Sequence, residues 1–159
     1  MSHLANLPRL LIEEWLPAQA IGVECMRENS TGLHPPPNRL HVWWARRPLT
    51  IARAAVLASL LPADFDRRTF EGLSGEELVR LRAIMDTGVR LGGFGCNRAF
   101  TGILHEQDLQ MMRSKMEQLW GKTPLVLDPM AGGGSIPLEA VRLGLEVQTN
   151  EYSPWHAQS

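Results

Sequence analysis

The residues best suited to chemistry lie near the C-terminus, where residues 128–135 read Asp-Pro-Met-Ala-Gly-Gly-Gly-Ser. An apolar run at 125–127 precedes them, and a helical pattern follows to about Leu143. This order predicts a short buried strand, a glycine-rich turn and a helix. Glycines let the backbone pass close to a ligand, and the start of the helix points its unpaired N–H groups at the same place. We therefore expect a ligand-binding turn, with Asp128 at the end of the strand to accept hydrogen bonds from a polar, partly cationic ligand.

An acidic residue follows at the distance that a nucleotide ribose requires. A second apolar run at 145–147 predicts another strand, and Glu151 comes shortly after it. A carboxylate about 20 positions beyond a glycine turn can bind the two ribose hydroxyls. The dinucleotide pattern G-x-G-x-x-G fails because Pro137 occupies the third glycine position, and the phosphate-loop pattern fails because no lysine follows Gly134. The alternative to a nucleotide site is an ordinary Gly-rich β–α loop that binds nothing.

The pattern that remains is D-P-x-x-G-x-G-S, formed by Asp128, Pro129, Gly132, Gly134 and Ser135. It resembles the cofactor motif of the S-adenosylmethionine-dependent amino-methyltransferases that act on DNA, usually written D-P-F-x-G-x-G-[ST]. The resemblance implies that Asp128 faces the methionine moiety, that the glycines pass under the cofactor and that Glu151 holds the ribose. The expected cofactor-binding residues are Asp128, Pro129, Met130 (in place of the usual Phe), Ala131, Gly132, Gly133, Gly134, Ser135 and Glu151.

A second candidate site is basic and aromatic. Residues 39–53 contain four arginines and no acid, whereas the whole chain has a net charge of −1. Trp43 and Trp44 come just before Arg46 and Arg47. Arginine side chains suit phosphates and tryptophan rings suit stacking on bases, so this stretch predicts an anion or nucleic-acid contact.

Two alternatives to that site stay open. The tryptophans can belong to the core while the arginines pair with Glu13, Glu14 or other carboxylates. The chain as a whole can be a non-catalytic module that docks onto a nucleic acid or a protein through residues 43–53.

The string Leu40-His41-Val42-Trp43-Trp44-Ala45-Arg46-Arg47-Pro48 carries a second resemblance, together with Leu11-Ile12-Glu13 and Leu16-Pro17. It is similar to the N-terminal module of large bacterial and archaeal proteins described as adenine-specific DNA methylases containing a zinc ribbon, which often lie among phage-defence genes. The similarity covers roughly residues 8–62 and 122–154. It implies that DNA is a partner of the complete protein, and that the two tryptophans and the arginine pair form a shared structural or ligand-contacting element.

The second motif of adenine methylation is absent. Methyl transfer to an exocyclic amine uses [DNS]-P-P-[YFW], whose polar groups bind the amine and whose ring stacks on the flipped base. Residues 34–38 have the prolines without those flanking residues, and no zinc ribbon is present. We therefore predict no catalytic residue, no metal site and no turnover by this chain alone. Two parallel strands are not a stable sheet, so we expect the front part of a larger protein, or a second chain that supplies the remaining strands.

The expected fold class is α/β, with an N-terminal helical module and then the first β–α–β unit of an incomplete Rossmann-like sheet. The expected divisions are a helical module at 1–62, a helical connecting region at 63–121 and the start of the cofactor-binding domain at 122–159. Apolar spacing predicts helices at 7–15, 17–28, 50–61, 76–85 (opened by a capping box at Ser74) and 105–120.

Composition sets the remaining limits. With 44% hydrophobic residues the chain can build a core. Cys25 and Cys96 form no C-x-x-C pair, which predicts buried thiols in a reducing cytoplasm rather than a disulfide or a zinc site. No signal peptide or membrane span is expected.

Overall fold

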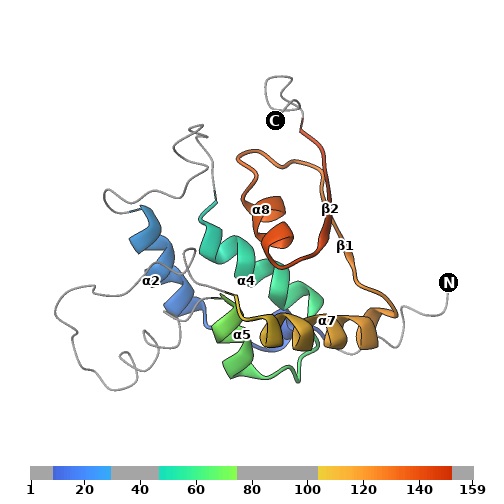
Figure 1. Cartoon of the computed structure of the whole chain (residues 1–159). Helices are drawn as coiled ribbons and strands as arrows, with labels where there is room; N and C mark the ends of the chain where they lie inside the picture. The colour runs from blue at the N-terminus through green and yellow to red at the C-terminus, as the bar shows by residue number, and fades with distance from the viewer. Residues whose placement is uncertain (1–8, 30–46, 75–103, 152–159) are drawn as a thin grey trace, which may run out of the picture.

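A computed structural model describes residues 9–29, 47–74 and 104–151 of the chain. Within these ranges the secondary structure is mixed, as expected for the α/β class (Figure 1). The helices are α1 (Leu11–Glu14), α2 (Ala18–Asn29), α4 (Leu49–Leu60), α5 (Arg67–Ser74), α7 (Glu106–Trp120) and α8 (Ser135–Arg142), and the strands are β1 (Leu125–Asp128) and β2 (Glu146–Thr149).

Helix α4 lies at the centre of the fold, between α2 and α8 in Figure 1. Its sequence is almost wholly apolar, which predicts burial on most sides, and eight of its twelve residues are buried. Its Leu57 belongs to one hydrophobic cluster that also includes Leu11 before it and Phe70, Met112 and Leu143 after it, all with 0% exposure. The early helices and the region around α8 therefore share a core.

Three of the predicted helices are confirmed to within about a residue at each end. Helix α2 begins after Pro17, and α7 ends at Gly121, whose φ of 76° is the left-handed conformation that glycine adopts readily. Leu109, Met112 and Met116 of α7 are buried, as their spacing predicts. In α2, Ile21 is buried, whereas Met26 is 74% exposed.

Two elements differ from the prediction. The first helix spans only Leu11–Glu14, and the chain before it pairs with the end of α4 through an antiparallel bridge between Leu10 and Pro62. Helix α5 was not predicted, although Asp66 caps its first turn by accepting hydrogen bonds from the Thr69 N–H (2.7 Å) and hydroxyl (2.8 Å). Ser74, expected to open a helix, is the last residue of α5, and the helix predicted at 76–85 lies outside the described residues.

The predicted β–α–β order is present. Strands β1 and β2 are parallel, in a register that runs from Leu125 opposite Glu146 to Asp128 opposite Thr149. Helix α8 connects them and packs against both strands. The outward residues of β1 stay accessible, since Leu125 is 47% exposed and Leu127 is 66% exposed. Among the described residues, no helix is both long enough and apolar enough to span a bilayer.

Candidate ligand-binding site

The turn between β1 and α8 has a backbone that requires glycine. Gly132 and Gly134 have φ values of 52° and 70°, a region that costs a residue with a β-carbon roughly 1–2 kcal/mol. The Gly134 N–H donates to the Ala131 carbonyl at 2.8 Å, and Gly134 then caps α8. A β-carbon at Gly134 would meet no atom of the described residues within 4 Å. The tight turn therefore leaves open space beside its last glycine.

Asp128 stands where the sequence predicted it, as the last residue of β1. Its side chain folds over the start of the turn, where Oδ1 accepts a hydrogen bond from the Met130 N–H at 3.2 Å. Its main-chain carbonyl accepts from the Asn150 N–H at 2.9 Å, across to the chain beyond β2. No hydrogen bond to Oδ2 is found within the described part of the chain, and Asp128 is 8% exposed.

Glu151 is the second acid that the structure brings to the turn. Its Oε2 accepts a hydrogen bond of 2.6 Å from the Gly132 N–H, and the neighbouring Ala131 N–H donates to the Asn150 carbonyl at 3.1 Å. The ends of both parallel strands therefore meet at one edge of the sheet, with the glycine turn between two carboxylates. Such an edge is where ligands bind in open α/β sheets.

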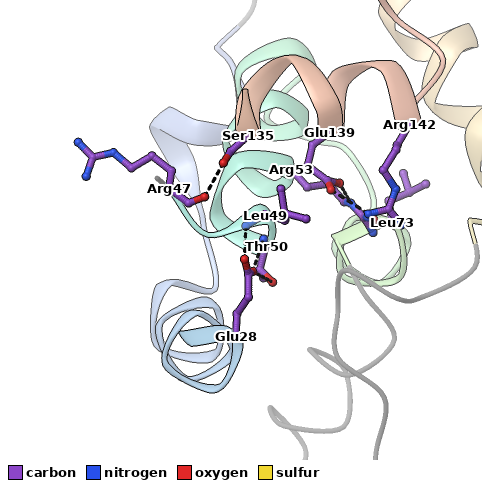
Figure 2. Close-up of polar contacts among 9 residues, drawn as sticks. All are labelled: Glu28, Arg47, Leu49, Thr50, Arg53, Leu73, Ser135, Glu139 and Arg142. Carbon is purple, nitrogen blue, oxygen red and sulfur yellow. Dashed lines mark hydrogen bonds and ion pairs between the residues drawn. The ribbon is translucent and has the colours of Figure 1, made fainter. Parts of the chain in front are cut away.

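Ser135 was expected to bind the cofactor, and its side chain makes a different contact. The hydroxyl is buried and donates a hydrogen bond of 2.6 Å to the main-chain carbonyl of Arg47 (Figure 2). The Arg47 side chain is exposed and extends away from α8. Of the predicted nucleic-acid contacts, Arg47 alone falls within the described residues, and Trp43, Trp44 and Arg46 lie outside them.

The start of α4 is occupied by a carboxylate of the protein itself. Helix N-termini attract anions, because their first N–H groups have no partner within the helix. Glu28 of α2, only 2% exposed, accepts from the N–H of Leu49 at 2.9 Å and from the N–H and hydroxyl of Thr50 at 3.2 and 3.4 Å. An anion bound beside Arg47 would therefore have to use the guanidinium group rather than the helix start.

A buried ion cluster, not predicted from the sequence, joins α4 to α8. Arg53 Nε donates to Glu139 Oε2 at 2.5 Å and Nη1 to the Leu73 carbonyl at 3.4 Å, while Arg142 binds the other carboxylate oxygen of Glu139 at 2.8 Å (Figure 2). Burial lowers the pKa of Arg53, and the charge of Glu139 opposes that effect. The sequence feature that could have predicted this cluster is Arg53, which lies in an almost wholly apolar helix. A buried charge needs a buried partner of opposite charge.

The alternative in which arginines pair with carboxylates therefore holds for Arg53. Glu14 pairs with Arg9, and Glu13 accepts from the Leu10 N–H at 2.9 Å. In the described ranges, no group of three or more His, Cys, Asp or Glu side chains is arranged to hold a metal ion. A surface groove of about 370 Å³ lies elsewhere, between the end of α4 and α7, and is lined by residues such as Pro62 and Lys115.

A comparison with known protein families finds a match in the first part of the chain. Residues 15–83 match a family model described as "Protein of unknown function (DUF1156)". The match includes α2, α4 and α5, and so Glu28, Arg47 and Arg53, but it ends before the glycine turn. The chain matches no curated protein and no solved structure. The likeness to known proteins therefore rests on residues 15–83, hereafter the DUF1156 segment, whose helix α4 packs against α8, the helix that follows the turn.

Proposed function

We propose that the chain is the N-terminal, S-adenosylmethionine-binding portion of an adenine-specific DNA methyltransferase. The observation that carries the proposal is the pair of carboxylates at the glycine turn. Asp128 is the last residue of β1, Glu151 lies just beyond the end of the parallel strand β2, and the Gly132 N–H donates to Glu151 at 2.6 Å. A cofactor with a cationic amino group and a ribose diol needs acceptors of this kind at this edge of a sheet.

The residues fit the cofactor in three ways. The Asp128 carboxylate can accept from the amino group of the methionine moiety, and the Glu151 carboxylate can accept from the ribose hydroxyls. The turn at 132–134 has room beside Gly134 for a ligand to approach the backbone. The bound cofactor would supply a methyl group on a sulfonium centre, and this chain's own residues would bind and orient it.

The methyltransferase part of the proposal rests on resemblance and on the exposed apolar residues of β1. The DUF1156 segment and the Trp-Trp-Ala-Arg-Arg-Pro string are similar to the front of adenine-specific DNA methylases, so DNA is the proposed partner. A parallel sheet is ordinarily covered on both faces, yet Leu125 and Leu127 remain exposed on β1. We propose that further strands of a Rossmann-like sheet, from a longer polypeptide or a second chain, complete it and carry the catalytic motif.

Calorimetric titration with S-adenosylmethionine tests the cofactor-binding part of the proposal. The wild-type chain is expected to bind, and Glu151→Gln and Asp128→Asn should each weaken binding about tenfold or more, because each removes the charge of one acceptor while keeping its shape. Glu146→Gln is the matched control, since this exposed acid of β2 lies away from the turn and should leave affinity unchanged. No binding by a folded sample, or equal affinity for Asp128→Asn and wild type, would reject the proposal.

A docking module remains the second candidate, and the exposed guanidinium of Arg47 favours it. On that basis the chain would bind duplex DNA with an affinity that falls steeply as salt rises. Fluorescence anisotropy distinguishes the docking module from the cofactor-binding proposal. The measurement uses a labelled duplex at several salt concentrations, with wild type and Arg47→Ala. DNA binding that depends on Arg47, in a protein that gives no heat with S-adenosylmethionine, would support the docking module.

A further inference from the structure

We infer that the DUF1156 segment holds the glycine turn in its binding shape, with Arg53 and Ser135 as positioning residues. The inference depends on the proposed function for the identity of the ligand. It gives the DUF1156 segment a role, and it assigns Ser135 to the support of the turn rather than to the ligand itself.

The first link is at the start of α8. Ser135 comes directly after Gly134, whose backbone is free to adopt many conformations, so the turn alone does not determine where the helix begins. The hydrogen bond of 2.6 Å from the Ser135 hydroxyl to the Arg47 carbonyl ties that point to the residue just before α4. Ser135 is 5% exposed, so a ligand in the turn would find its hydroxyl already engaged.

The second link lies one helical turn further on. Ser135 and Glu139 are four residues apart and so occupy one face of α8. Glu139 is fully buried and meets Arg53 at 2.5 Å, while Arg142 binds its other oxygen. Figure 2 shows both links reaching the same stretch of chain, 47–53. Two polar contacts of fixed geometry therefore set both the position and the rotation of α8 against α4.

Stability alone does not account for this pair. Buried ion pairs are often replaced by apolar residues without loss of stability, because burial of the charges costs about as much as their attraction returns. Arg53 Nη2 is also buried without a hydrogen-bond partner among the described residues, so the cluster is not arranged for the greatest stability. The directional hydrogen bonds of this ion pair instead favour one alignment of the two helices.

The test uses Arg53→Met combined with Glu139→Leu, and separately Ser135→Ala. We would measure the urea midpoint, hydrogen exchange of the 132–134 amides in the ligand-free protein, and the Kd for S-adenosylmethionine. The double variant should keep a cooperative transition with a midpoint near or above that of wild type. Its turn amides should nevertheless exchange at least tenfold faster, and its Kd should rise at least tenfold. Ser135→Ala should change exchange and Kd in the same direction, and Ser135→Thr, which keeps a hydroxyl, should restore both.

The readouts separate the possible failures. If wild type itself does not bind S-adenosylmethionine, the proposed function fails, and exchange of the turn amides still decides the positioning role. Unchanged exchange in both variants would overturn the inference. A loss of affinity in Ser135→Ala with unchanged exchange would make Ser135 a direct ligand and likewise overturn its assignment here. If the double variant does not fold, Arg53→Lys, which keeps the charge but loses the planar guanidinium, takes its place under the same criteria.

Discussion

Glu28, in the last turn of α2, accepts a hydrogen bond of 2.9 Å from the main-chain N–H of Leu49, 21 positions later at the start of α4. A side chain from another helix thus binds the first N–H groups of α4, which are usually bound by the N-cap residue of the helix itself. The contact fixes the beginning of the central helix, and with it the Arg47 main-chain carbonyl and the Arg53 side chain, both of which bind residues of α8.

We expect Glu28→Ala to lower the free energy of unfolding by about 1–3 kcal/mol, because it leaves two buried N–H groups without an acceptor. Urea denaturation followed by circular dichroism measures the change. Gln19→Ala, an exposed substitution in the same helix, is the control and should change the value by less than about 0.5 kcal/mol. A loss as small as that of the control would show that Glu28 does not cap α4.

Gly134→Ala should destabilise the protein by about 1–2 kcal/mol, because φ is 70° and the surrounding space is open, so that backbone strain is the main effect. Gly22→Ala forms a matched comparison. A β-carbon at Gly22 would also meet no atom of the described residues within 4 Å, but Gly22 lies inside α2, where alanine should stabilise by up to about 1 kcal/mol. We expect the two substitutions to change the free energy of unfolding in opposite directions. An unchanged free energy of unfolding for Gly134→Ala would contradict the observed turn.

The cap of α5 should make stability depend on acid pH. Hydrogen bonds from the Thr69 N–H and hydroxyl lower the pKa of Asp66 below its ordinary 3.8. A carboxyl group with a lowered pKa in the folded state contributes stability above about pH 4, and that contribution is lost as pH falls through the lowered value. The difference in urea midpoint between wild type and Asp66→Asn should therefore be greatest near neutral pH and shrink below about pH 4. A constant difference across that range would be inconsistent with the cap.

Cys25 should react slowly with alkylating agents in the native protein. Burial, and then the charge of Glu28, raise the pKa of its thiol from 9.0 to about 11, which reduces the reactive thiolate about 100-fold at neutral pH. The rate of iodoacetamide labelling in a Cys96→Ser variant measures this. The same variant in urea should label at the rate of an ordinary thiol, and equal rates in the two states would contradict the partial burial of Cys25.

Local signals accounted for much of the fold. Helix α2 after Pro17, the apolar α4, and α7 with Gly121 at its end follow from spacing and from the conformations of proline and glycine. The β–α–β order follows from two apolar runs around a glycine turn. These are properties of neighbouring residues, and so they can be read without knowing the fold. The Rossmann-like sheet and the division at 62 and 121 remain predictions.

The sequence by itself determined helices α2, α4 and α7, the β–α–β order, and the chemical types at the turn, namely glycines between two acids. Only the tertiary structure decided which groups meet. Ser135 reaches the Arg47 carbonyl across 88 positions, and Arg53 reaches Glu139 across 86. Such contacts depend on how α4 and α8 pack, which is set by the burial of the whole apolar surface and not by any short stretch. For the same reason Met26 is 74% exposed although it is apolar and lies in the same helix as the buried Ile21.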